Sequence, residues 1–249
     1  MTTQATVFKS GGTCSDTSLP KLYRDTAIAA DTLFCYDALD TYSWPTQAAP
    51  VGAASWIDLA DVANATFAAV TTGWSDGFVF DSADKDLLTL PTTSKRADGQ
   101  QLGLAVWLKF ATTAAGSRGI IDMSDGTTAT SQYAVYRDGS NIVLRADATS
   151  SGTQAITASV VYQLGITIEL SGSTYTSKLW LNNAVVKTVT SSSPLCIPSK
   201  TTCTIGQIPA ISANGDDFTL YRVHGCNLSD RTGAEFIAAD YASGVGRFS

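Results

Sequence analysis

Apolar and polar residues alternate along much of the chain from about Trp56 onward. The clearest run extends from Leu102 to Phe110, where every second residue is large and apolar and Trp107 lies on the other face. A repeat of two residues is the period of a β-strand. Because both faces of this run are fairly apolar, we expect a strand in the middle of a sheet, with one face on the core and Trp107 partly covered.

Two hairpins are predicted downstream of this strand. Residues 133–146 contain two alternating runs around Asp138-Gly139, and a glycine there supplies the positive φ that a tight turn needs. Residues 162–187 repeat the arrangement, with a reversal at Asn182-Asn183, since asparagine tolerates the left-handed region. Predicted strands recur at intervals of roughly ten residues, which is typical of a sandwich.

One helix is predicted near the end of the sequence. Thr232 followed three residues later by Glu235 has the spacing of a capping box, and apolar side chains of residues 234–241 share one helical face. Gly244 suits the end of such a helix. The chain also has 33 Thr, 26 Ser and 20 Asp against only 2 Glu, a composition that favours strands and turns.

The composition excludes several partners. The net charge is −6, which argues against nucleic acid and against anionic membranes. No apolar run approaches the roughly 18 residues of a membrane helix. The segment Met1–Gly12 lacks the apolar stretch of a secretory signal, so we expect synthesis without export.

Four stretches resemble, in order, landmarks of the concanavalin A-like lectin/glucanase superfamily in its laminin-G-like form. They are Gly77–Asp81 with Leu88–Pro91, Leu104–Lys109, Lys178–Asn183, and Asp216–Val223 followed by Leu228–Asp230 and Glu235. The family usually has Asn-Gly where this chain has Asn182-Asn183. The resemblance implies an all-β jelly-roll sandwich of two antiparallel sheets with one short C-terminal helix. We expect this sandwich over residues 51–249, preceded by an irregular docking arm over residues 1–50.

The sequence predicts no catalytic residues and no enzymatic activity. Glycoside hydrolases of this superfamily need two paired carboxyl groups, whereas the only glutamates here are Glu169, on a predicted strand, and Glu235, in the predicted helix. His224 is the only histidine, and no Gly-x-Ser-x-Gly elbow accompanies it. A zinc site built from Cys196, Cys203, His224 and Cys226 is a weaker interpretation than separate thiols.

Two binding sites are candidates. Asp81, Asp84 and Asp86 offer three carboxylates that suit calcium, but a solvated Asp-rich turn is the favoured interpretation of the same residues. No other cofactor is expected. Trp44, Trp56 and Trp74 fall in predicted loops or strand ends, where an exposed ring can stack on a sugar.

Lectin-like sandwiches that lack a signal and a catalytic pair resemble structural proteins of bacteriophage virions, and residues 24–34 resemble the openings of such proteins. The first functional hypothesis is therefore a non-enzymatic virion component, such as a capsid decoration, collar, tail or fibre protein. Its location would be the virion and its partners other virion proteins, as a homo-oligomer or on a symmetric scaffold. The alternative is a carbohydrate-binding adhesion module that recognises cell-surface glycans.

Overall fold

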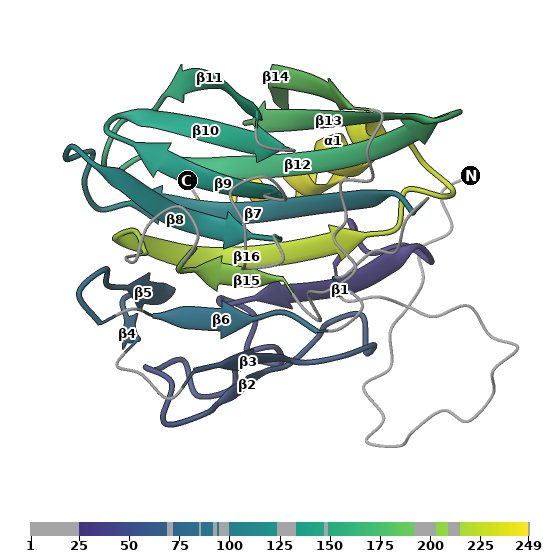
Figure 1. Cartoon of the computed structure of the whole chain (residues 1–249). Coiled ribbons are helices and arrows are strands. Elements are labelled where there is room, and N and C mark those ends of the chain that lie inside the picture. The colour runs from purple at the N-terminus through teal and green to yellow at the C-terminus, as the bar shows by residue number, and fades with distance from the viewer. Residues whose placement is uncertain are drawn as a thin grey trace, which may run out of the picture.

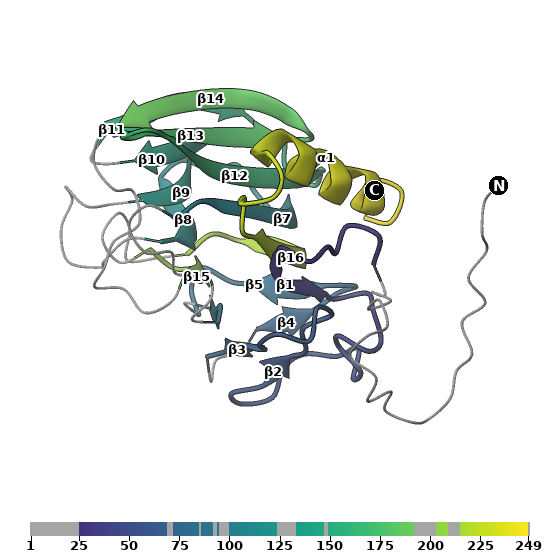
Figure 2. The ribbon, with the colours of Figure 1, turned by 90° about the vertical axis from the view of Figure 1, so that its right-hand side faces the viewer.

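The computed structural model describes residues 25–68, 72–84, 86–91, 94, 100–123, 133–146, 149–191, 203–208 and 215–248. These residues form two eight-stranded sheets and one helix. The sheets pack face to face, and the helix lies against the outer side of one of them (Figures 1 and 2). Every ladder between strands in this part of the chain is antiparallel, and the predicted two-sheet jelly-roll sandwich is confirmed.

The first sheet, sheet A, has the order β14-β13-β12-β7-β16-β5-β4, with β1 pairing along the same edge of β16 as β5. Its strands are β1 (Thr32–Asp37), β4 (Gly73–Trp74), β5 (Phe78–Phe80), β7 (Leu102–Phe110), β12 (Val161–Ser171), β13 (Thr174–Leu181), β14 (Ala184–Ser191) and β16 (Phe218–Cys226).

The second sheet, sheet B, has the order β11-β10-β9-β8-β15-β6-β3-β2. Its strands are β2 (Ser55–Trp56), β3 (Ala65–Phe67), β6 (Leu87–Thr89), β8 (Ser117–Asp122), β9 (Tyr133–Asp138), β10 (Asn141–Ala146), β11 (Thr149–Ala155) and β15 (Thr204–Gly206).

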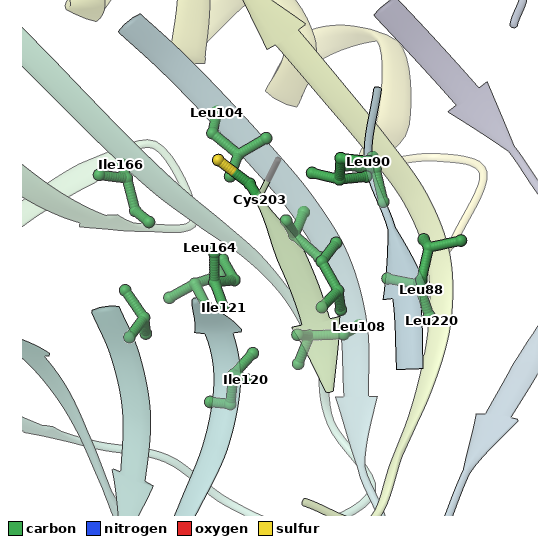
Figure 3. Packing of buried hydrophobic residues seen from close by; sticks show 14 of the residues in the cluster. Leu88, Leu90, Leu104, Leu108, Ile120, Ile121, Leu164, Ile166, Cys203 and Leu220 are labelled. Carbon is green, nitrogen blue, oxygen red and sulfur yellow. The ribbon is translucent and has the colours of Figure 1, made fainter. Parts of the chain in front are cut away.

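The main hydrophobic core fills the space between the two sheets. Strand β7 contributes Leu104 and Leu108 from the face that the two-residue repeat predicted, and they meet Ile120 of sheet B in the same cluster (Figure 3). The opposite face of β7 is also covered, because Trp107 is only 3% exposed and packs in a second cluster with Tyr221. Trp107 was expected to be partly covered, but it is fully buried.

Both predicted hairpin turns are confirmed. Asp138 pairs with Asn141 across a two-residue turn in which Gly139 has a φ of 58°. Asn182 and Asn183 adopt φ values of 48° and 64° between β13 and β14, so both asparagines occupy the left-handed region.

The predicted docking arm over residues 1–50 is wrong for residues 25–50, which belong to the sandwich. Strand β1 pairs with β16, with Cys35 opposite His224 and Asp37 opposite Arg222. Tyr36 is fully buried in the core between the sheets. The domain boundary therefore does not lie at residue 50, because a β-strand and core side chains precede it. Residues 1–24 lie outside the described residues.

The helix α1 (Gly233–Gly244) begins with the predicted capping box. The Thr232 hydroxyl accepts from the backbone N–H of Glu235, and the Glu235 carboxylate accepts from the backbone N–H of Thr232 at 2.8 Å. This reciprocal pair satisfies two amides that the helix itself leaves without partners. No helix among the described residues has the length and apolar character required to cross a membrane.

Glycines on sheet A let α1 approach closely. A Cβ atom placed on Gly103 of β7 would lie 2.6 Å from the Phe236 ring, and one on Gly165 of β12 would lie 2.5 Å from Ile237. Phe236 and Ile237 are fully buried on the sheet. The absence of side chains at these two positions therefore allows the helix to pack directly against sheet A.

Replacing Gly103 with valine is expected to destabilise the protein by about 1–3 kcal/mol, because the added carbons overpack the contact with Phe236. Denaturant unfolding of the Gly103→Val variant measures this cost. Gly246→Ala is the matched control, since its added Cβ meets nothing within 4 Å. Equal stability of the two variants would contradict the close packing of α1.

Candidate functional site

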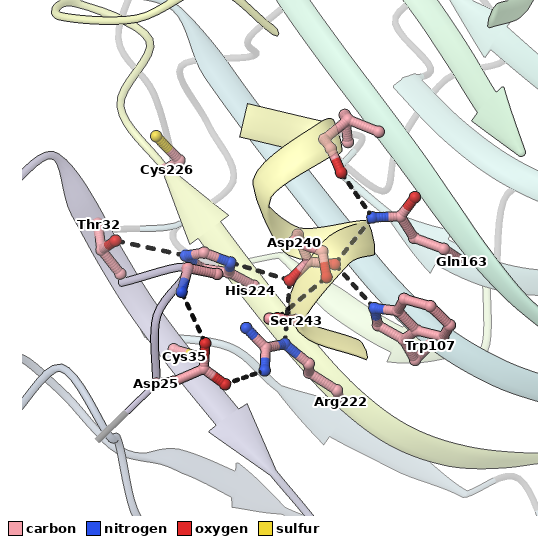
Figure 4. Close-up of polar contacts among 12 residues, drawn as sticks. Asp25, Thr32, Cys35, Trp107, Gln163, Arg222, His224, Cys226, Asp240 and Ser243 are labelled. Carbon is pink, nitrogen blue, oxygen red and sulfur yellow. Dashed lines mark hydrogen bonds and ion pairs between the residues drawn. The ribbon is translucent and has the colours of Figure 1, made fainter. Parts of the chain in front are cut away.

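A buried polar network lies between α1 and the outer face of sheet A (Figure 4). At its centre is Asp240, a fully buried aspartate of α1. One oxygen, Oδ2, accepts hydrogen bonds from Trp107 Nε1 at 2.8 Å and Gln163 Nε2 at 2.9 Å. The other, Oδ1, accepts from Arg222 Nε and lies 3.0 Å from His224 Nδ1. Four side chains of three strands therefore converge on one carboxylate.

Arg222 joins this network to the N-terminal part of the chain. Its Nη1 donates to Asp25 and lies 3.7 Å from Asp37 Oδ2, and Arg247 Nη1 forms an ion pair with the same Asp37 oxygen at 2.9 Å. Burial raises the pKa of Asp37 to about 6, although the positive charges of Arg247 and Arg222 act to lower it. Burial alone would also raise the pKa of Asp240, but Arg222 and His224 hold it well below the usual range.

His224 connects Asp240 to Thr32, since its Nε2 lies 3.3 Å from the Thr32 hydroxyl oxygen. Burial lowers the pKa of His224, which favours a neutral ring that donates from Nδ1 to Asp240 and accepts at Nε2. The hydroxyl of Thr32, the imidazole of His224 and the carboxylate of Asp240 follow one another as the three groups of a catalytic triad do. However, His224 and Asp240 are fully buried and Thr32 is 7% exposed, so no substrate reaches this arrangement and its role is structural.

The structure places two of the predicted sugar-stacking tryptophans in the core. Trp44 is 4% exposed and packs edge-on against Phe78, and Trp56 is fully buried beside Tyr36. Neither ring has a free face, so the platform interpretation is wrong for both. Trp74 is half-buried and packs against the main core, also edge-on to Phe78. The positions of the three tryptophans near turns predicted exposed rings. Instead, Trp44 and Trp56 belong to the core and Trp74 packs against it.

The three aspartates proposed for calcium do not converge. Asp86 is buried, and its carboxylate accepts from the Thr72 hydroxyl at 3.0 Å and from the backbone N–H of Asp81 at 2.8 Å. The Asp81 carboxylate caps the N–H of Ala83, and Asp84 is exposed. Within the described ranges, no group of three acidic, histidine or cysteine side chains could hold a metal ion. The aspartates stabilise a turn, which is the simpler of the two interpretations.

The cysteines and the histidine do not form a common site in the described part of the chain. Cys35, Cys203 and Cys226 are buried, and the Cys203 sulfur lies 3.2 Å from the carbonyl oxygen of Ser94. Cys14 and Cys196 lie outside the described residues. Burial raises the pKa of Cys226 to about 12, although the charge of Arg231 acts to lower it.

An open groove lies where the β16–α1 connection crosses the ends of β7 and β12. Its volume is about 330 Å³, and it is lined by Gln101, Glu169, Leu228–Thr232 and Glu235. Gln101 is fixed at both ends of its amide, since Nε2 donates to the carbonyl of Leu228 and Oε1 accepts from the backbone N–H of Leu170. The groove is therefore a preformed feature with a polar lining.

Both glutamates of the chain face this groove, although they lie on separate elements as the sequence predicted. Glu169 accepts from the backbone N–H of Gly233 at 3.0 Å and from Lys178 Nζ at 2.8 Å. Partial burial acts to raise the pKa of Glu169. The hydrogen bonds from Lys178 and from the Gly233 N–H stabilise the charged form more strongly, so the pKa is lowered overall. Hydrogen bonds from Thr232 lower the pKa of Glu235. Both groups are thus hydrogen-bond acceptors at neutral pH.

Comparison with known proteins identifies the fold but no family. No family model and no curated protein matches the sequence. Among solved structures, Trypanosoma rangeli sialidase in complex with sialic acid is similar with a TM-score of 0.61 and 11% identity, over 90% of this chain and 34% of the sialidase. The receptor binding domain of botulinum neurotoxin D is similar with a TM-score of 0.55 and 13% identity, over 85% of this chain and 52% of that one. The chain thus spans about a third of the sialidases' length.

The expectation that this protein is not an enzyme is contradicted by these matches, because the proteins of like fold include sialidases, which are enzymes. The fold gives no ground for excluding catalysis. At 10–11% identity the likeness shows the fold alone and assigns no sialidase activity to this chain. The virion location and the virion partners stay predictions, since nothing in the structure or in the similarities described above tests them.

Proposed function

We propose that this protein is a carbohydrate-binding domain and that the groove beside α1 is its binding site. The observation that carries the proposal is a preformed open groove whose lining presents both donors and acceptors of hydrogen bonds. Sugar-binding sites need a few polar groups at fixed positions. The fold likeness supports the same class, because the similar structures include a sialidase bound to sialic acid.

The site differs from the tryptophan platform that the sequence predicted. Trp44 and Trp56 belong to the core, so replacing them with alanine tests stability and not binding. The groove instead presents exposed side chains of Ser229, Asp230 and Glu235, which can be replaced without opening the core.

The experiment is a glycan array with the full chain, followed by calorimetric titration of the sugars that bind. Glu235→Gln is the test variant, because glutamine keeps the capping box while it removes the carboxylate charge. Loss of one charged hydrogen bond, worth about 1.5–3 kcal/mol, is expected to weaken binding about tenfold or more. Asp138→Asn on β9 is the matched control with an exposed acid outside the groove.

The proposal predicts binding that Glu235→Gln weakens and Asp138→Asn leaves unchanged. It is wrong if no sugar binds to the wild-type chain, or if both variants bind as the wild type does.

A further inference from the structure

Residues 245–248 follow α1 and cover aromatic rings on the outer face of sheet A. The backbone N–H groups at positions 245, 247 and 248 donate to carbonyls in the last turn of α1, so the segment continues directly from the helix. The ring of Phe248 stacks on Tyr221, with the ring centres 5.8 Å apart, and its centre lies 5.2 Å from that of Trp107. Phe248 therefore covers two rings of sheet A.

An ion pair ties this segment to β1. Arg247 Nη1 lies 2.9 Å from Asp37 Oδ2, and the Asp37 side chain is fully buried whereas that of Arg247 is 34% exposed. Among the described residues, no group donates a hydrogen bond to this oxygen of Asp37. Arg222 Nη1 is farther away, at 3.7 Å. Arg247 is therefore the closer of the two positive charges that face Asp37.

The buried network around Asp37 contains more acids than bases. Its charged and titratable members in the described part of the chain are Asp25, Asp37, Asp240, Arg222, Arg247, His224 and Cys35. Burial disfavours the charged forms of His224 and Cys35, so both are neutral at pH 7. Three carboxylates then face two guanidinium groups, which leaves one negative charge in excess.

Asp37 is the least compensated of the three carboxylates. Asp25 and Asp240 both accept hydrogen bonds from Arg222, whereas Asp37 accepts one from the backbone N–H of Leu39 at 2.9 Å. Burial raises the pKa of Asp37 to about 6. Despite burial, Arg222 holds the pKa of Asp25 and that of Asp240 below the usual range. Asp37 is therefore the member of the network that takes up a proton first as the pH falls from 7.

A proton and Arg247 compete for Asp37. The charge of Arg247 acts against burial and lowers the pKa of Asp37, so this pKa is higher when the segment is detached than when it is in place. A group whose pKa differs between two states links the equilibrium between those states to pH. Because the detached state binds the proton more tightly, a fall in pH favours detachment.

We propose that residues 245–248 form a proton-sensitive latch, in which protonation of Asp37 releases Arg247 and lets the segment move away from Trp107 and Tyr221. Opening uncovers an aromatic surface beside Lys109, whose Nζ lies 5.9 Å from the centre of the Tyr221 ring. The latch lies at the C-terminal end of α1, whereas the groove of the proposed function lies at the N-terminal end. The two proposals are therefore independent of each other.

The first test is hydrogen exchange, followed by mass spectrometry of a C-terminal peptide that contains residues 245–248. Asp37→Asn keeps the size of the side chain and mimics the protonated acid at any pH. At pH 7.5 we expect this peptide to exchange about fivefold faster in the variant than in the wild type, because the ion pair with Arg247 is lost. At pH 5 we expect both chains to exchange alike, since Asp37 of the wild type is then protonated.

Two controls separate opening of the latch from a loss of global stability. A peptide from β7 in the same sample is expected to exchange no faster in Asp37→Asn than in the wild type. Asp138→Asn, which changes an exposed acid of β9, is expected to leave exchange of the C-terminal peptide unchanged. Faster exchange of the β7 peptide together with the C-terminal peptide would contradict a local latch.

The second test measures the reverse coupling in Arg247→Gln. NMR of the Asp37 carboxyl carbon, assigned through backbone correlations, gives the midpoint of its titration. We expect a midpoint near pH 6 in the wild type and one about one pH unit higher in Arg247→Gln. Lys187→Gln removes a cation from β14, at the far edge of sheet A, and is expected to leave the midpoint unchanged.

Either test can overturn the inference. It is wrong if the C-terminal peptide of Asp37→Asn exchanges like that of the wild type at pH 7.5, or if the difference persists at pH 5. A titration midpoint that Arg247→Gln leaves unchanged also overturns it, because Arg247 and the proton then do not compete. Arg247 is partly exposed, so this second measurement decides the question even if Asp37→Asn does not fold.

Discussion

A chain that lacks residues 1–50 is expected not to fold. The truncation removes β1, whose ladder with β16 completes one edge of sheet A, and it removes Tyr36 and Trp44 from the core. It also removes Asp25 and Asp37, which are the partners of the buried Arg222 on that side. Of its described carboxylate partners, Arg222 then retains only Asp240. Breaking a buried ion pair costs about 3–5 kcal/mol, which is a large part of the stability of an ordinary domain. Circular dichroism and thermal unfolding measure the outcome.

Removing residues 1–20 is the matched control, because it keeps every described residue. We expect this shorter truncation to give a cooperative unfolding transition. If the chain that begins at residue 51 unfolds with a transition like that of the control, residues 25–50 are dispensable and the assignment of β1 to the sandwich is wrong.

Replacing Asp240 with asparagine is expected to destabilise the protein by about 3–5 kcal/mol. The change keeps the size of the side chain, but it removes the charge that faces Arg222 and His224 and places an amide where four donors converge. Denaturant unfolding at neutral pH measures the loss. Glu235→Gln, on the exposed side of the same helix, is the control and is expected to unfold at a denaturant concentration close to that of the wild type.

The cost of Asp240→Asn is also expected to depend on pH. Because Arg222 and His224 lower the pKa of Asp240 in the folded chain, its stabilising contribution is full above the ordinary aspartate pKa of about 3.9. That contribution falls as the pH drops from there toward the lowered value. The difference between wild type and variant therefore shrinks below about pH 4. A difference below about 1 kcal/mol at pH 7 would contradict the central role given to Asp240.

The strands were predictable where local pattern decides them. The alternation in β7, the glycine at position 139 and the paired asparagines 182 and 183 act within a few residues, and each prediction is confirmed. Strand β1 lacks such an alternation, because Leu33–Tyr36 are all apolar, and this run fits a short strand or a turn equally well. Its ladder partner is β16, far along the sequence. The place of β1 in sheet A depends on pairing with a distant strand, and a local sequence pattern cannot predict that pairing.

The residues of the candidate groove were less predictable for the same reason. Glu169 and Glu235 were placed on the correct elements, but their meeting in one groove depends on how α1 packs back onto β12. Asp240 did leave a signal in the sequence. It follows Phe236 by four residues, so it lies on the apolar face of the helix, where a charge requires a buried partner.

The pairing of β1 with β16 has a consequence for how the chain assembles. Thr32 and His224 lie 192 positions apart, so β1 cannot acquire its ladder until β16 has left the ribosome. Until then its backbone edge and its aromatic side chains remain uncovered, a state that invites association with other nascent chains. Closure of this long loop is expected to be a late and slow event in folding.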